Sequence, residues 1–123
     1  MNENRDQRLP TVKPQLVEKP WGREEWLAVG ERIVMKRIVV HAGSRLSLQK
    51  HVVKEEAWLL LRGRARVRFG DLEGVLAAGD VLHIRPDTVH RIAAIDEVEL
   101  IEASTPELDD VVRLDDDYGR TGR

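Results

Sequence analysis

The sequence predicts an all-β domain, either a β-sandwich or a β-barrel. Apolar and β-branched residues recur in about seven or eight short runs at a spacing of roughly ten residues, which is typical of these architectures. Some of the runs alternate strictly between apolar and polar residues, as a half-buried strand does. No segment shows a long helical pattern of apolar residues.

Length and composition fit one compact domain. The chain has 123 residues, of which 41% are hydrophobic and 34% are charged, and its net charge is −2. A chain of this length leaves no room for a second domain. The near-balanced charge predicts binding neither to nucleic acid nor to a membrane surface. The sequence contains no cysteine, which excludes disulfides and thiolate metal sites.

The first residues predict a flexible tail outside the domain. Residues 1–15 are polar and contain two prolines, so we expect the folded domain to cover residues 16–120. The tail has no apolar run and does not resemble a secretory signal. No apolar run elsewhere is long enough to span a bilayer. We therefore expect a cytoplasmic protein.

The strands are expected to begin at Leu16 and to continue through the middle of the chain. Residues 32–40, RIVMKRIVV, are rich in β-branched side chains, which favour strands. Residues 45–51, RLSLQKH, alternate strictly. One face of that predicted strand carries Arg45, Ser47, Gln49 and His51, and the other carries Leu46 and Leu48.

The second half of the chain continues the strand pattern. Residues 56–70 predict two strands joined at Arg62-Gly63, and the arginines that alternate along the second strand predict a solvated face. Residues 74–84 carry a Gly-Asp turn in their middle. Further strands are predicted at 90–95 and 98–104. The acidic segment 106–120 is expected to hold one or two helical turns.

Four side chains of the kind that binds metal ions lie in these strands. Gln49 and His51 are two residues apart and project from one face of a strand. Glu56 stands where the next strand begins, and His90 starts a later strand. Imidazole with oxygen donors suits a divalent first-row metal such as Zn, Mn, Fe or Ni. On spacing alone, a metal site and ordinary surface or hydrogen-bonded residues both remain open.

The glycines around these residues carry a resemblance to a known superfamily. The block Gly43-x5-Gln49-x-His51-x4-Glu56-x6-Gly63 resembles the first motif of the cupins, with Gln in place of its first His. The resemblance implies a cupin β-barrel, also called a double-stranded β-helix or jelly roll. It also implies that the strand bearing Gln49 and His51 is a barrel wall that faces a metal.

The second cupin motif is matched more loosely. The segment 79–90 resembles it and ends on His90, which in the motif completes the metal site. Arg85, Asp87 and Ala94 stand where the motif has Pro, Gly and Asn. These differences affect the expected geometry of the turn rather than the ligand itself.

A narrower resemblance covers about residues 16–120. KPWG, LSLQ-x-H, EAW and the terminal D-x-YGR are similar to the type II mannose-6-phosphate isomerase family. Its cupin domain follows a sugar-nucleotide transferase domain in many members, and Gln-x-His is typical of it. Many members have histidines where this chain has Val52, Val53 and Ala57. We therefore expect a less polar pocket and allow for a different substrate.

The resemblance implies interconversion of mannose 6-phosphate and fructose 6-phosphate. A divalent metal, with zinc ranked first and Mn, Co, Fe or Ni as alternatives, would polarise the substrate oxygens. Its implied ligands are Gln49, His51, Glu56 and His90. A base must also move a proton between two carbons, and cations must hold the phosphate.

Four further residues are candidates for catalysis or substrate contact. Arg45 shares the parity of Gln49 and is expected to face the pocket. Lys54 lies on the turn between two ligands, where the family commonly has Arg. The base is open between Glu102 and His83.

Two other function classes remain open, and the partners follow from the resemblance. The chain could be a metal cupin of other activity, such as an oxygenase or an epimerase-like enzyme, or a non-catalytic sugar-binding or regulatory cupin. It has no Gly-rich nucleotide loop, so nucleotidyl transfer is not expected. The expected partners are a small sugar phosphate and a second copy of the chain, with segments 16–30 and 105–120 crossing between subunits of a homodimer.

Overall fold

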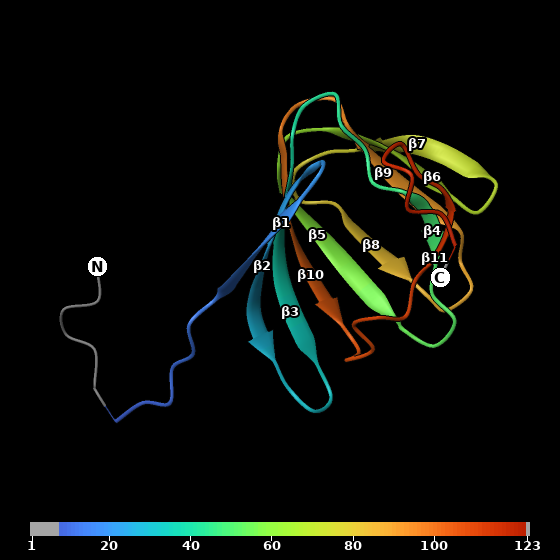
Figure 1. The fold of residues 1–123 in the computed structure, drawn as a ribbon. Helices are drawn as coiled ribbons and strands as arrows, with labels where there is room; N and C mark the ends of the chain where they lie inside the picture. Colours follow the sequence, from blue (N-terminus) through green and yellow to red (C-terminus); the bar gives the residue numbers. More distant parts are fainter. Residues whose placement is uncertain (1–7, 123) are drawn as a thin grey trace.

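The computed structural model describes residues 8–122, and every regular element in that range is a β-strand. The strands form two antiparallel sheets (Figure 1). The first has the order β1-β2-β3-β10-β5-β8 and comprises β1 (Gln15–Lys19), β2 (Gly22–Val29), β3 (Val34–Val40), β10 (Val98–Ser104), β5 (Glu56–Arg62) and β8 (Val81–Ile84). The second has the order β11-β4-β9-β6-β7 and comprises β11 (Val112–Asp115), β4 (Leu48–Lys50), β9 (His90–Ala94), β6 (Ala65–Phe69) and β7 (Leu72–Leu76).

The prediction of an all-β fold is confirmed, with more and shorter strands than the sequence pattern suggested. None of the residues 8–122 lies in a helix long and apolar enough to cross a membrane. Residues 8–14 are exposed and form no strand, and β1 begins at Gln15. Residues 1–7 of the predicted tail lie outside the described range.

The interior between the sheets is divided into an apolar half and a polar half. On β10, the inward residues Val98 and Leu100 are apolar and buried, whereas Glu102 and Ser104 are polar and also buried. Strand β9 runs the other way, from buried His90 to the apolar core residue Ile92. The apolar half supplies the hydrophobic stabilisation, and the polar half contains the candidate site.

Two predictions about local structure are wrong. The strand predicted at 45–51 is interrupted: only Leu48–Lys50 form β4, and Arg45 makes an isolated bridge to Ala93. The helical turns predicted within 106–120 are absent, because Val112–Asp115 pair with β4 as strand β11. Tertiary pairing decides the conformation of this acidic segment, which a local pattern does not reveal.

Gly63 ends the predicted turn after β5 in a conformation that favours glycine. Its φ is +85°, and a Cβ atom placed there would lie 2.2 Å from the carbonyl oxygen of Glu97. Gly70 also has a positive φ, of +59°, but a Cβ there would meet nothing within 4 Å. Substituting each of the two glycines therefore distinguishes the cost of backbone strain from the cost of a close approach between chain segments.

We expect Gly63→Ala to destabilise the protein clearly more than Gly70→Ala. Gly70→Ala should cost roughly 1–2 kcal/mol, because only the left-handed conformation is penalised. Gly63→Ala adds a clash with backbone that cannot move without shifting β10. Urea denaturation of both variants checks this difference, and equal midpoints would show that the close approach at Gly63 is not present in solution.

The C-terminal segment closes on itself through one ion pair and one backbone bridge. Arg113 and Gly122 exchange backbone hydrogen bonds of 2.9 and 2.8 Å. Between them, Asp116 accepts hydrogen bonds from the Arg120 side chain at 2.8 and 3.0 Å. The Arg120 guanidinium lowers the pKa of Asp116 to about 2, with further help from backbone N–H donors. This segment returns to the barrel beside β4.

Because the folded-state pKa of Asp116 is depressed, its stabilising contribution is present above the ordinary pKa of an aspartate. We expect that contribution to be lost as the pH falls from about 4 towards 2. Asp116→Asn should lower the melting temperature at pH 7 and differ little from wild type near pH 2. Thermal melts across this range check the convergence. A difference in melting temperature between the two proteins that stays constant across this pH range would exclude the Asp116 charge as the cause of that difference.

Candidate metal centre and pocket

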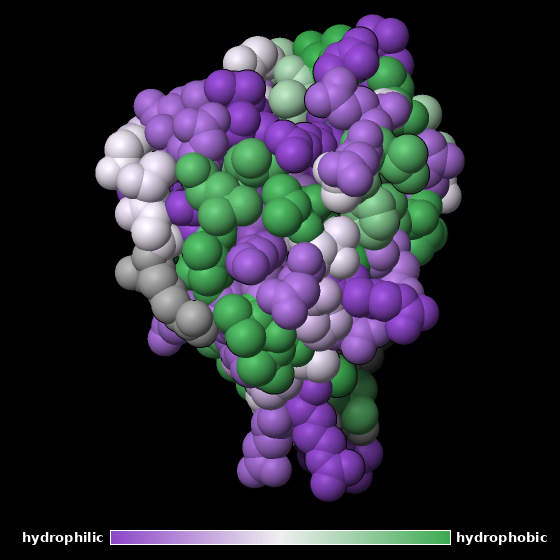
Figure 2. All heavy atoms as spheres, turned by 90° about the vertical axis from the view of Figure 1, so that its right-hand side faces the viewer, coloured by the Kyte–Doolittle hydropathy of each residue, from purple (hydrophilic) through white to green (hydrophobic). Residues whose placement is uncertain are grey.

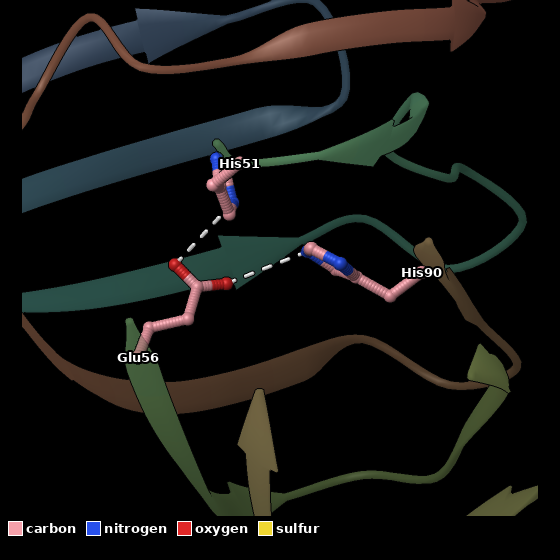
Figure 3. A group of neighbouring side chains, drawn as sticks. All are labelled: His51, Glu56 and His90. Carbon is pink, nitrogen blue, oxygen red and sulfur yellow. Dashed lines mark ion pairs between the residues drawn. The ribbon is translucent and has the colours of Figure 1, made fainter. Parts of the chain in front are cut away.

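Two histidines and one glutamate meet inside the polar half of the barrel. His51, Glu56 and His90 are buried, and one potential ligand atom from each lies within 4.8 Å of the others. Nε2 of His51 lies 3.6 Å from one Glu56 carboxylate oxygen, and Nε2 of His90 lies 3.5 Å from the other (Figure 3). The sequence prediction that these three residues converge is confirmed.

The other ring nitrogen of each histidine is held by a backbone carbonyl. Nδ1 of His51 donates to the carbonyl of Asp110 at 2.5 Å, and Nδ1 of His90 donates to the carbonyl of Thr88 at 2.8 Å. A carbonyl oxygen can only accept a hydrogen bond, so Nδ1 carries the hydrogen in both rings. In the neutral imidazoles, Nε2 then presents a lone pair to the Glu56 carboxylate.

In this arrangement, hydrogen-bond acceptors face one another in the buried interior of the barrel. Nε2 of both histidines and Oε1 of Glu56 have no hydrogen-bond partner among residues 8–122. Unpaired buried polar atoms are costly, and a divalent cation among them would satisfy all three. Imidazole rings oriented by backbone carbonyls are the usual arrangement around a bound metal. The residues present therefore fit a metal ion.

The three residues come from both sheets. His51 follows β4 and His90 opens β9 in the second sheet, whereas Glu56 opens β5 in the first. Gln49 and His90 are direct neighbours across β4 and β9. The candidate centre therefore lies between the sheets.

Asp110 shapes the loop between His51 and Glu56. Its carboxylate accepts three hydrogen bonds from the backbone N–H groups of Val52, Val53 and Lys54, at 3.0, 2.7 and 2.8 Å. Burial acts to raise the pKa of Asp110, but these donors outweigh it and lower the pKa to about 2. The same residue fixes the His51 ring through its carbonyl. No sequence motif predicted this role, because Asp110 is far from the loop along the chain.

The turn before His90 keeps its geometry despite the departures from the cupin motif. Asp87 takes the place of Gly and adopts a φ of +62°, the left-handed conformation that aspartate tolerates better than most residues. Its N–H donates to the carbonyl of His51 at 2.6 Å. The turn thereby links the two histidine segments.

Gln49 lines the same pocket as His51 and Glu56. Its amide oxygen accepts a hydrogen bond of 2.9 Å from the Ser47 hydroxyl. The prediction that it faces inward with His51 is confirmed, whereas its role as a fourth metal ligand remains a prediction.

Lys54 and Glu102 extend the centre with a buried charge network. The Lys54 ammonium lies 3.0 Å from Glu56 and 3.3 Å from Glu102, and all three side chains are buried. Burial raises the pKa of Glu102, and the Glu56 charge adds to that effect. Burial also acts to raise the pKa of Glu56, but hydrogen bonds from Nε2–H of His51 and His90 in their protonated forms, together with the Lys54 charge, hold it well below its ordinary value. The two carboxyl groups thus differ in proton affinity.

A pocket of about 460 Å³ opens onto this network. Trp58 is buried in its wall and meets the His90 ring edge-on, with ring centroids 5.6 Å apart. Sequence reasoning did not place several other lining residues there: Lys19, Glu24, Trp26, Lys36, Asp109, Arg113 and Arg120. The alternation of residues along β2 and β3 is consistent with inward-facing Trp26 and Lys36, but no local sequence pattern indicated that the other residues line the pocket.

The expectation for Arg45 is wrong. Its side chain is 43% exposed and forms a bidentate pair with Asp117 at 2.7 and 2.8 Å, and it does not line the pocket. The parity argument failed because the strand is interrupted between Arg45 and Leu48. The other candidate base, His83, is exposed and pairs with Glu55 at 2.5 Å.

The expectation of a pocket less polar than in the family stays a prediction. Val52 and Val53 are exposed on the loop that Asp110 holds, and Ala57 is not a lining residue. The three residues that replace the family's histidines therefore do not form part of the pocket walls of this chain.

Comparison with known proteins places these features in a family. The family model described as mannose-6-phosphate isomerase C-terminal matches residues 6–116. Xanthan biosynthesis protein XanB of Xanthomonas campestris pv. campestris is 36% identical, over 85% of this chain and 24% of that protein. Mannose-1-phosphate guanylyltransferase ManC of Salmonella typhimurium is 35% identical, over 85% of this chain and 23% of that protein. The chain spans about a quarter of the length of these relatives.

The fold is shared with solved structures of low sequence identity. An RmlC-like cupin from Shewanella frigidimarina superposes with a TM-score of 0.71 at 16% identity, over 79% of this chain and 87% of that one. This likeness confirms the predicted cupin barrel.

We expect the purified protein to bind one divalent ion at the three buried residues. His90→Ala should weaken zinc affinity by more than about a hundredfold, because even residues that only support a ligand contribute ten- to a hundredfold. Added zinc should raise the melting temperature of the wild type, since the ion binds the folded state. Calorimetric titration and thermal melts measure both effects.

The matched control is His83→Ala, which removes an exposed histidine outside the group. It should leave zinc affinity unchanged. Equal zinc affinity in wild type and His90→Ala would place the ion elsewhere.

Proposed function

The chain belongs to the family of mannose-6-phosphate isomerase C-terminal domains, and from this premise we propose that its pocket is a metal-dependent sugar-phosphate isomerase site. The proposed reaction interconverts an aldose phosphate and a ketose phosphate, with mannose 6-phosphate and fructose 6-phosphate as the first pair to test. The observation that carries the proposal is the buried group of His51, Glu56 and His90, whose facing acceptor atoms fit a cation.

The proposed metal ligands are Gln49, His51, Glu56 and His90. A divalent metal bound there would polarise the carbonyl and hydroxyl oxygens at the first two carbons of the sugar. Zinc ranks first for such a donor set, because two imidazoles and oxygen ligands suit it. The two backbone carbonyls that hold the histidine rings would keep both Nε2 atoms aimed at the site.

Glu102 is the proposed base. Isomerisation removes a proton from the second carbon and returns one to the first, while a hydroxyl hydrogen passes between the two oxygens. Glu102 is buried in the pocket wall with a raised pKa, which suits a carboxyl group that must accept and return a proton near neutral pH. Lys54, 3.3 Å away, would stabilise negative charge on the enediol oxygens.

The relatives support a sugar-phosphate substrate without defining the reaction of this chain. One of the matching proteins is described as a mannose-1-phosphate guanylyltransferase, and the matched part covers less than a quarter of it. The proposal concerns the cupin pocket alone. The alternative is a pocket that binds a sugar phosphate without turning it over, and the turnover assay below distinguishes it from an isomerase.

We expect metal-loaded protein to form fructose 6-phosphate from mannose 6-phosphate, and Glu102→Gln to lower kcat by about 10²- to 10⁴-fold. Lys54→Ala should reduce turnover by about ten- to a hundredfold, the value of a hydrogen bond to a charged group. Coupled spectrophotometric assays measure turnover, and elemental analysis confirms that each variant retains its metal.

Glu99→Gln and Lys50→Ala are the controls, because both residues lie outside the pocket: Glu99 shares β10 with Glu102, and Lys50 ends β4, ahead of the loop that carries Lys54. No turnover above a metal-stripped sample, across Zn, Mn, Co and Ni, would exclude the isomerase and leave the binding function. Turnover that is unaffected by Glu102→Gln would keep the isomerase and exclude Glu102 as the base.

A further inference from the structure

Arg113 presents an unused guanidinium donor to the pocket. It lies on β11 and lines the pocket, and its Nε is buried without a hydrogen-bond partner. Resting on the proposed function, we infer that Arg113 anchors a subsite for the phosphate group of the substrate. A buried N–H donor without an acceptor is costly, and a phosphate oxygen would supply the missing acceptor.

The other strong cations of the pocket are already engaged. Lys36 lies 3.1 Å from Glu24, and Arg120 is held by Asp116 at 2.8 Å. Lys54 is shared between two carboxylates. Lys19 also interacts with the Glu24 charge, whereas Arg113 takes part in none of the ion pairs within residues 8–122 and its buried Nε–H has no acceptor.

The position of Arg113 relative to the candidate centre suits a hexose phosphate. Arg113 is the direct neighbour of Gln49 across β11 and β4, and Gln49 is the direct neighbour of His90 across β4 and β9. Two strand spacings of about 4.8 Å separate Arg113 from His90, or roughly 10 Å between their backbones. An open-chain hexose has a comparable length between its first two carbons and a terminal phosphate.

The chemistry of the guanidinium favours phosphate over a neutral sugar hydroxyl. Its planar donors match two oxygens of a phosphate dianion, and charge-assisted hydrogen bonds are about twice as strong as neutral ones. Arg113 is itself held in place, because its backbone bonds to Gly122 on one side and pairs with Gln49 on the other. The backbone of Arg113 therefore loses little freedom on binding, and the ordering cost is confined to its side chain.

Calorimetric titration with mannose 6-phosphate and with mannose tests the subsite. Wild type should bind the phosphate ester at least tenfold more tightly than the neutral sugar. Arg113→Gln should weaken mannose 6-phosphate binding about ten- to a hundredfold while leaving mannose and zinc affinity unchanged. Arg66→Gln, which removes an exposed arginine of β6, is the matched control and should change none of them.

A second measurement uses the unaltered protein, in case Arg113→Gln folds poorly. The Arg113 Nε–H resonance, assigned by NMR, should shift on addition of mannose 6-phosphate or inorganic phosphate and not on addition of mannose. Equal mannose 6-phosphate affinity in wild type and Arg113→Gln, or an unmoved resonance on saturation with the ester, would overturn the Arg113 subsite while leaving the proposed function intact. Failure of the wild type to bind mannose 6-phosphate would overturn both.

Discussion

The structure of the polar half of this barrel depends on the electrostatic repulsion between three buried side chains. Two imidazole lone pairs and a carboxylate face one another among residues with almost no solvent contact. Such groups repel when left alone, and burial removes the water that would screen them. The nearby Lys54 ammonium relieves only the side of Glu56 that it touches. A cation at the centre would turn the same geometry from a destabilising arrangement into an attractive one.

The orientation of that group is set by loops rather than by the strands that carry it. Carbonyls of Asp110 and Thr88 determine which nitrogen of each ring faces inward. Asp110 also organises the chain between His51 and Glu56. Asp110 is distant in sequence from the histidine that it orients, whereas Thr88 is only two residues from His90. A substitution in either loop should alter the site without touching a ligand.

The fold and the central residues could be predicted from sequence because local signals mark them. Alternation identifies strands, and glycine spacing around Gln49, His51 and Glu56 matches a motif. Arg45 was misplaced because alternation holds only while a strand is unbroken, and a break at Arg45–Leu48 leaves no local signature. Arg113 was missed because its position depends on the pairing of β11 with β4, a long-range contact. The contact between Lys54 and Glu102 depends on the pairing of β10 with β5 in the first sheet, which is another long-range contact.

The division of the barrel interior into two halves has a mechanical consequence. One end is closed by side chains such as Leu60, Ile92 and Leu100, whose packing depends little on solution composition. The other end is joined by charges contributed from opposite sheets. The sheets are therefore held by apolar packing at one end and, at the other, by buried polar groups whose mutual attraction would depend on a bound cation and so on chelators. The pocket is lined by the polar groups of that end, so removing a divalent cation is expected to loosen the sheets next to the pocket first.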